Sequence, residues 1–193
     1  GMYNIGITKK VYIFQRLIEN LLDVVREAES WIPLYVMTSD KNHEATTAFL
    51  KEHDYFGYNS EYVTFFMQDM APACDYEGKV YMEKPWKIST SPNGNGGWYT
   101  SMHKWGVAQK AISDGVEWLN VFAVDNVLQR IADPCFVGAT LLNDCAVGAK
   151  VVCKCTPDEK IGAICTEDGK PSIIENYELT DELMNAKDEQ GNL

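Results

Sequence analysis

A nearly unbroken apolar run in the middle of the chain constrains the fold more than any other feature. Leu119 and the four residues from Val121 to Val124 are apolar and are bounded by polar residues. This pattern is typical of a strand that is covered on both faces, so it predicts a central strand of an α/β sheet within residues 116–124. The run stops at Asp125, which places a carboxylate at the strand end, where open α/β sheets bind ligands.

Asp125 suits a hard cation such as Mg²⁺, which binds carboxylates and clamps phosphate oxygens. An Asp-Asn pair taken alone is more often an ordinary turn. The choice between a metal site and a turn therefore depends on the rest of the sequence.

The composition indicates a globular protein of ordinary domain size. The chain has 193 residues, of which 46% are hydrophobic and 11% aromatic, and we expect a single domain over residues 1–193. The formal net charge of −11 argues against nucleic-acid and anionic-membrane partners, because both favour a positive field. The sequence contains no apolar run of about 18 residues and no secretory signal pattern, so we expect a cytoplasmic location.

The six cysteines form no Cys-x-x-Cys pair, and no histidine lies at metal-motif spacing from them. Most lie in apolar runs, where cysteine commonly behaves as a small hydrophobic residue. The pattern favours structural thiols over a zinc site.

Apolar periodicity predicts strands that alternate with helices. The expected helices span residues 10–29, 42–53, 98–112 and 134–143, with a helix-prone acidic segment at 180–190; the expected strands span 31–39, 62–68, 116–124, 147–155, 161–166 and 172–177. Short hairpin arms are expected around Cys74 and Val80, and Asp168-Gly169 predicts a hairpin turn. The order of these elements predicts an α/β fold with a mixed sheet.

The segment Ser91-Pro-Asn-Gly-Asn-Gly-Gly97 is the densest turn signal in the chain, and a predicted helix follows it. Its bare backbone amides and the helix N-terminus suit a negatively charged ligand, although a glycine-rich turn alone is more often structural. It is neither a Walker A loop nor Gly-x-Gly-x-x-Gly. Together with Thr38-Ser39, Gln68 and Asp125, it would converge on one crevice at the ends of the strands.

Eight phrases in a fixed order resemble the UDP-sugar pyrophosphorylases, most closely the UDP-N-acetylhexosamine type. The phrases are Pro33-Leu-Tyr-Val-Met-Thr-Ser39, Phe65-Phe-Met-Gln68, Ser91-Pro-Asn-Gly-Asn-Gly-Gly97, Val121-Phe-Ala-Val-Asp-Asn-Val127, Ala132-Asp-Pro134, Val147-Gly-Ala-Lys-Val-Val152, Glu159-Lys-Ile-Gly162 and Ile173-Ile-Glu175. The family joins UTP to a sugar 1-phosphate with Mg²⁺ and releases pyrophosphate. The resemblance implies a Rossmann-like, glycosyltransferase-A-like fold whose mostly parallel sheet is flanked by helices.

The resemblance also implies roles for individual residues. Gln68 and the backbone of Gly94 would read the uracil edge, and Asn95 would contact the sugar or ribose. Asp125 would be the catalytic residue that binds the ribose and the metal. Gly162 and Glu175 would bind the sugar hydroxyls and the N-acetyl region. These side-chain types suit those ligand groups, since an amide pairs with an imide edge and a carboxylate accepts from hydroxyls.

The chain departs from the family pattern at its ends. The family's signature glycine-rich loop lies just upstream of a segment equivalent to Met2–Gly6, so we expect a partial nucleotidyltransferase domain without the first strand and the phosphate loop. Later sugar-binding segments of the family would follow Leu193. A smaller departure is Asn176, where the family usually has tyrosine.

Two functions remain open on this basis. The first is a UTP:sugar-1-phosphate uridylyltransferase that is weak or inactive over these residues, because preorganised phosphate-binding amides are lost. The second is a noncatalytic UDP-sugar-binding or oligomeric assembly module, in which exposed sheet edges pair with another copy. A dinucleotide oxidoreductase is disfavoured because the sequence has no Gly-x-Gly-x-x-Gly.

Overall fold

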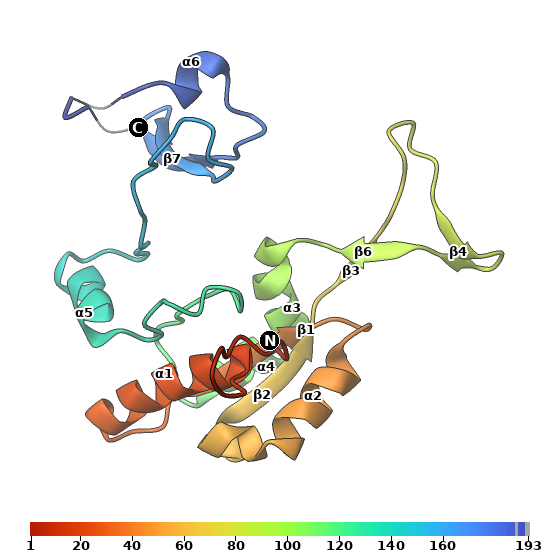
Figure 1. The fold of residues 1–193 in the computed structure, drawn as a ribbon, viewed down its shortest axis with the longest axis vertical. Helices are drawn as coiled ribbons and strands as arrows, with labels where there is room; N and C mark the ends of the chain where they lie inside the picture. Colours follow the sequence, from red (N-terminus) through yellow and green to blue (C-terminus); the bar gives the residue numbers. More distant parts are fainter. Residues whose placement is uncertain (188, 192–193) are drawn as a thin grey trace. The chain divides into compact units, whose positions relative to one another are not determined.

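The computed structural model describes residues 1–187 and 189–191. The chain forms two compact units, Gly1–Leu142 and Asn143–Leu193. The first unit contains the helices α1 (Ile13–Ala28), α2 (His43–Glu52), η1 (Asp54–Gly57), η2 (Ser60–Tyr62), η3 (Asn95–Gly97), α3 (Trp98–Lys104), α4 (Val107–Ser113) and α5 (Pro134–Leu142), and the strands β1 (Leu34–Thr38), β2 (Val63–Met67), β3 (Met70–Pro72), β4 (Met82–Lys84), β5 (Lys87–Ile88) and β6 (Thr90–Pro92) (Figure 1). The second unit contains β7 (Ala163–Glu167), β8 (Lys170–Ile174) and α6 (Asp181–Met184).

The first unit is built around a parallel pair of strands. β1 pairs with β2 in a register that runs from Leu34 opposite Val63 to Thr38 opposite Met67. Helix α2 lies between the two strands in sequence, as a parallel connection requires. This order confirms the predicted succession of strand, helix and strand.

Helix α1 supplies most of the core on one face of the strand pair. Its apolar residues recur at helical spacing, and Leu17, Ile18 and Leu21 are at most 4% exposed. They cluster with the buried residues Leu50 and Tyr58 and with the partly buried residues Leu34, Val63 and Phe65. The sequence pattern therefore predicted this helix correctly.

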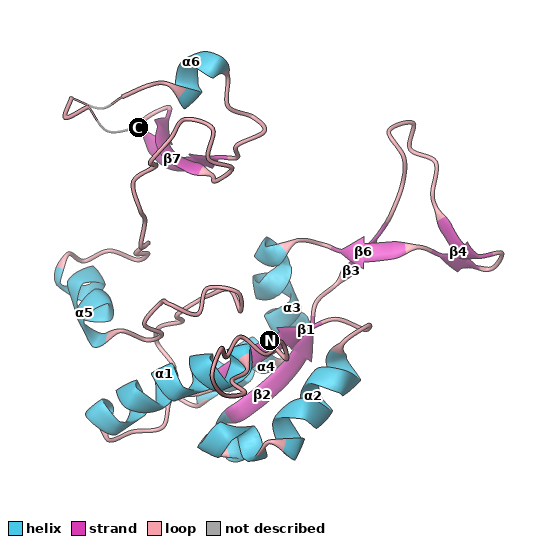
Figure 2. Cartoon of the chain, viewed as in Figure 1, coloured by secondary structure: helices cyan, strands magenta, loops and turns pink. Residues whose placement is uncertain are grey.

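Helices α3 and α4 cover the opposite face. Phe66 of β2 clusters with Met102, Val107 and Ala111, and Tyr35 and Met37 of β1 pack against this cluster. Because successive strand residues point to opposite faces, β1 and β2 bury apolar side chains on both sides. The strand pair is thus the middle of three layers (Figure 2).

One helix was predicted over residues 98–112, and the structure has two. Gly106 has a φ of 70°, in the left-handed region, and separates α3 from α4. This conformation suits glycine, and it lets the chain change direction between the helices.

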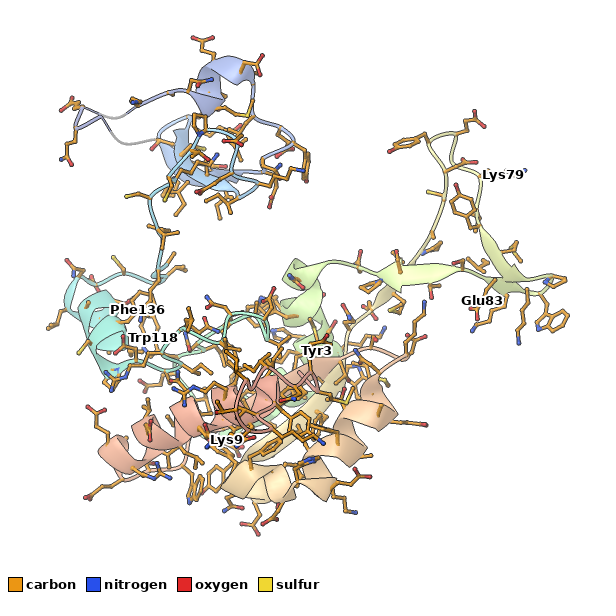
Figure 3. All side chains as sticks on the ribbon, viewed as in Figure 1. Tyr3, Lys9, Lys79, Glu83, Trp118 and Phe136 are labelled. Carbon is orange, nitrogen blue, oxygen red and sulfur yellow. The ribbon has the colours of Figure 1, made fainter. Side chains whose placement is uncertain are left out.

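An arm of short antiparallel strands extends from the end of β2. β3 pairs with β6, β4 pairs with β5, and an isolated bridge joins Cys74 to Val80. The bridge confirms the expected hairpin arms around these two residues. Lys79 and Glu83 lie on this arm (Figure 3).

The central strand predicted over residues 116–124 is wrong. The structure has no strand in this segment, and Leu119, Val121 and Val124 are 43%, 56% and 42% exposed. A strand needs a neighbour for its backbone groups, and within the described residues β1 pairs with β2 alone. Side chains hold the segment instead: Asn120 Oδ1 accepts from the N–H of Ala132 at 2.8 Å.

The second unit centres on the β7–β8 hairpin. The strands pair from Ala163 opposite Ile174 to Glu167 opposite Lys170. Asp168 and Gly169 have φ values of 50° and 77°, which are typical of the predicted two-residue hairpin turn. The strand predicted over residues 147–155 is wrong, because this segment has no regular structure and pairs with no described strand.

The fold is α/β with parallel and antiparallel pairing, as predicted, but a mostly parallel sheet is not what forms. Among the described residues, one two-stranded sheet is parallel and three are antiparallel. No helix in this part of the chain has both the length and the apolar character that a membrane span requires.

Candidate functional site at the carboxyl ends of two parallel strands

The end of β1 is fixed by buried polar groups. Thr38 and Ser39 are 3% and 5% exposed. Thr38 Oγ1 lies 2.8 Å from His43 Nδ1 and donates to the carbonyl of Phe66 at 3.2 Å. The N–H of Ser39 donates to Asn42 Oδ1 at 2.8 Å, so the chain turns directly from β1 into α2. The predicted pair Thr38-Ser39 therefore supports the strand end.

Gln68 follows β2 at the same edge. Its N–H donates to the carbonyl of Thr38 at 2.8 Å, which continues the ladder by one step. The residue is partly buried and lines a hollow of about 380 Å³. The other lining residues are Asp40, Met67, Asp69, Lys104 and Trp105. A side-chain amide thus borders a hollow beside the carboxyl ends of two parallel strands, where α/β folds place ligands.

Asp69 joins three elements around this hollow. Its N–H donates to Ser101 Oγ at 3.3 Å, and Ser101 is fully buried. Its carbonyl accepts from the N–H of Asn93 at 3.2 Å. Its carboxylate accepts from Lys104 Nζ at 2.5 Å. The residue after Gln68 therefore connects β2 to α3 and to the glycine-rich turn.

The glycine-rich turn presents bare backbone. Gly94 has a φ of 79°, and a Cβ added there would meet nothing within 4 Å. Its carbonyl accepts from the N–H of Gly97 at 3.3 Å, and α3 begins at the next residue. Gly94 and Asn95 are both exposed. Because Asn93 is bonded to Asp69, the structure brings this turn to the strand end that carries Gln68.

Asp125 lies elsewhere in the first unit, in an exposed turn. The N–H of Val127 donates to its carbonyl at 3.2 Å. Asp125 does not line the hollow beside Gln68. Within the described ranges, no three His, Cys, Asp or Glu side chains gather as metal ligands. An exposed single carboxylate still fits Mg²⁺, which commonly binds through one or two carboxylates, water and substrate phosphates.

Gly162 and Glu175 lie together in the second unit. They flank the paired ends of β7 and β8, and a Cβ placed on Gly162 would lie 3.7 Å from Glu175 Oε2. The N–H of Glu175 donates to Glu178 Oε2 at 3.1 Å, which fixes the backbone at this end of the hairpin. A Cβ there would also lie 3.2 Å from Ile173 Cγ2, so the Gly162 backbone packs closely against β8.

Sequence reasoning missed Asp69 and Lys104. Asp69 carried a usable signal, because it directly follows the predicted strand-end residue Gln68. Lys104 lies 35 residues further along and reaches the hollow only through the placement of α3. No local pattern predicts a contact of that separation.

Comparisons with known proteins identify the family. Residues 3–191 match the family described as UTP--glucose-1-phosphate uridylyltransferase. UDP-N-acetylglucosamine pyrophosphorylase of Saccharomyces cerevisiae is 39% identical over 99% of this chain and 41% of its own length. UDP-N-acetylglucosamine diphosphorylase 2 of Arabidopsis thaliana is 40% identical over 72% of this chain and 30% of its own length.

A crystal structure from Entamoeba histolytica, described as a UDP-N-acetylglucosamine pyrophosphorylase, matches with a TM-score of 0.90 and 31% identity over all of this chain and 50% of that one. The chain spans less than half of the length of the two curated relatives. These matches confirm the resemblance predicted from the eight phrases. The chain belongs to the UTP–glucose-1-phosphate uridylyltransferase family, within which it is similar to UDP-N-acetylglucosamine pyrophosphorylases.

Proposed function

We propose that this chain carries the uridine- and sugar-recognising part of a uridylyltransferase that joins UTP to a sugar 1-phosphate, of the UDP-N-acetylglucosamine pyrophosphorylase type. One observation supports this above the others: the Asn93–Asp69 hydrogen bond fastens the glycine-rich turn beside Gln68 at the end of β2. Family membership supports the reaction class. In this proposal β1 and β2 belong to a Rossmann-like sheet, and the strand ends form its ligand-binding edge.

The uracil ring would be read by Gln68 and by the backbone of Gly94. A glutamine amide has one acceptor oxygen and an NH₂ donor, so it can pair with the N3–H and a carbonyl of an imide edge. Gly94 has no Cβ and a left-handed φ, so its backbone can approach a ring closely. Asn95, the next residue, would donate to ribose or sugar oxygens.

Asp125 would hold Mg²⁺ and accept from the ribose hydroxyls. When bound, the ion supplies positive charge that offsets the charge on the phosphate oxygens. Asp125 is exposed, so its carboxylate can reach a ligand from solvent. Gly162 and Glu175 would bind the sugar hydroxyls and the N-acetyl region, with the Glu175 carboxylate accepting from hydroxyls.

Recognition and turnover are separate properties in this proposal. The signature glycine-rich loop of the family is not among these 193 residues. Loss of preorganised phosphate-binding amides removes several kcal/mol of transition-state stabilisation. The 193-residue chain should therefore bind uridine nucleotides and turn over slowly. Release of pyrophosphate from UTP, N-acetylglucosamine 1-phosphate and Mg²⁺ measures turnover, and rapid release would contradict slow turnover while leaving recognition intact.

Calorimetric titration with UDP-N-acetylglucosamine tests recognition. The wild-type chain should bind saturably, and Gln68→Ala should weaken binding about tenfold, because a buried hydrogen-bonding edge of the ligand loses its partner. Gln109→Ala is the matched control, since Gln109 is an exposed glutamine of α4 that does not line the hollow. Absence of binding by the wild type, or equal binding by Gln68→Ala, would contradict the proposal.

A second candidate function is an assembly module, which the exposed apolar segment favours. Leu119, Val121 and Val124 are strand-forming residues that pair with no described strand. Unpaired strand edges and exposed apolar side chains favour pairing between copies. Sedimentation over a range of concentrations tests this function, and a strict monomer would count against it.

A further inference from the structure

The hollow beside Gln68 contains a cation that the family resemblance did not assign. We propose that Lys104 makes this hollow select 4-oxo pyrimidines such as uracil over 4-amino pyrimidines such as cytosine. The inference rests on the proposed function, because it concerns the same pyrimidine site. It adds a specificity-determining residue and a reason for the choice of base.

A glutamine amide alone selects poorly between the two bases. Uracil presents an N3–H donor and an O4 acceptor, whereas cytosine presents an N3 acceptor and an N4 amino donor. The side-chain amide carries an acceptor and a donor, and rotation by half a turn exchanges them. Gln68 can therefore pair with either base unless a neighbouring group favours one orientation.

Lys104 supplies a group with a fixed hydrogen-bonding character. An ammonium has three donors and no acceptor, and its bond to Asp69 Oδ1 at 2.5 Å uses one of them. Lys104 and Gln68 line the same hollow of about 380 Å³. The remaining donors can bind the O4 atom of uracil. The amino group of cytosine would face the ammonium donors with a donor of its own, so binding of cytosine is disfavoured.

Asp69 positions the lysine. Its backbone is bonded to the buried hydroxyl of Ser101 and to the N–H of Asn93, so its side chain extends from a fixed backbone position. The side chains of Lys104 and Asp69 are 64% and 42% exposed, so the pair is in contact with solvent. An exposed pair of this kind contributes little to stability, so its value would lie in orientation.

Removal of Lys104 should reverse the electrostatic preference of the hollow. Without the ammonium, the charged groups that line it are the carboxylates of Asp40 and Asp69. Carboxylates accept hydrogen bonds and favour an amino group over a carbonyl oxygen. Cytosine should therefore bind better in the absence of Lys104, and uracil worse.

The chain offers a closely matched control for this substitution. Lys110 Nζ lies 2.5 Å from Asp114 Oδ2, and the two side chains are 63% and 43% exposed. The pair thus has the same separation and nearly the same exposure as the Lys104–Asp69 pair. It lines a different hollow, which is bordered by Trp31, Tyr62 and Trp118.

The experiment compares the dissociation constants of UMP and CMP for the wild type, Lys104→Met, Lys104→Arg and Lys110→Met. The two nucleotides carry the same phosphate charge, so their ratio cancels general attraction to a cation. Lys104→Met should lower the preference for UMP about fivefold, the size of one exposed charge-assisted interaction. Lys104→Arg should retain most of the preference, and Lys110→Met should leave it unchanged.

Equal loss of affinity for both nucleotides in Lys104→Met, or an unchanged ratio, would overturn the assignment of selectivity to Lys104. If the wild type prefers UMP while the ratio is unaffected by Lys104→Met, this inference fails and the uridine site stands. If the wild type binds neither nucleotide, the uridine site itself fails. Lys104→Gln provides a second neutral variant, and thermal unfolding of each variant verifies that it is folded.

Discussion

Asn20 Nδ2 donates a hydrogen bond of 2.7 Å to the carbonyl of Gln129. Asn20 Oδ1 accepts in turn from the N–H of Ile131 at 3.3 Å. Both ends of one amide on α1 thus bind a segment more than a hundred residues later in the chain. Ile131 is 3% exposed, so this contact fixes the point at which the later segment joins the first core.

Substitution of Asn20 should destabilise the first unit. Asn20→Ala removes both side-chain partners of this segment, and we expect a loss of about 1–3 kcal/mol in the free energy of unfolding. Urea denaturation followed by tryptophan fluorescence measures the loss. Gln109→Ala, an exposed amide substitution on α4, should change the midpoint little. A midpoint for Asn20→Ala equal to that of this control would contradict the anchoring role.

Tyr58 should make stability fall at high pH. The residue is 3% exposed and its hydroxyl donates to the carbonyl of Ile32. Burial raises the pKa of Tyr58 from the ordinary tyrosine value of 10.0 to about 12. The folded state thus favours the neutral phenol, and its contribution to stability is complete below the unfolded pKa of about 10 and is lost as the pH rises toward about 12.

Phenolate absorbance measures this titration, which should include a step near pH 12 from Tyr58. Tyr58→Phe should remove that late step and flatten the fall in stability between about pH 10 and 12. A wild-type protein whose tyrosines all ionise near the ordinary pKa would contradict the burial of Tyr58 in solution.

Gly94→Ala should weaken uridine binding more than Gly96→Ala. Both positions are open, with no atom within 4 Å of an added Cβ, but Gly94 alone of the two has a positive φ, at 79°. Its ψ is 163°, a combination that is essentially restricted to glycine and costs an L-residue about 1–3 kcal/mol, so the turn should relax away from its ligand-binding shape. Titration with UMP compares the two variants, and equal affinities would exclude a role for the Gly94 backbone.

Asp125→Asn should remove the Mg²⁺ dependence of nucleotide binding. The substitution keeps the size of the side chain and removes the charge that a hard cation favours. Titration of UDP with and without Mg²⁺, with a chelator as the metal-free reference, should show enhancement by Mg²⁺ in the wild type and in the exposed control Asp23→Asn. Enhancement that persists in Asp125→Asn would place the metal elsewhere.

Local signals predicted much of the first unit. The helical spacing of apolar residues predicted α1, and the flanking polar residues predicted the ends of β1 and β2. The prediction of a strand over residues 116–124 was wrong. The apolar composition of this segment permits a strand, but a strand also needs a pairing neighbour elsewhere in the chain. The prediction of a strand over residues 147–155 was wrong for the same reason.

The candidate site divides in the same way. The places of Gln68 at a strand end and of Gly94 in a turn could be predicted, because strand ends and glycine-rich turns have local signatures, whereas their roles in binding stay predictions. Their connection through Asp69 and Asn93 could not, since it depends on the path of the arm between β3 and β6. The position of Asp125 relative to a strand end was wrong because the strand itself was wrong.

The closeness in sequence of β1, α2 and β2 has a consequence for synthesis on the ribosome. Thr38 bonds to Phe66 across 28 residues, and helix α1 packs on the same strands from the preceding segment. Contacts between segments that lie close in the sequence form early, because closing a short loop loses little chain entropy. A growing polypeptide can therefore pair β1 with β2 beneath α1 once residues 13–67 have left the exit tunnel, before Gln129 and Ile131 arrive to bind Asn20.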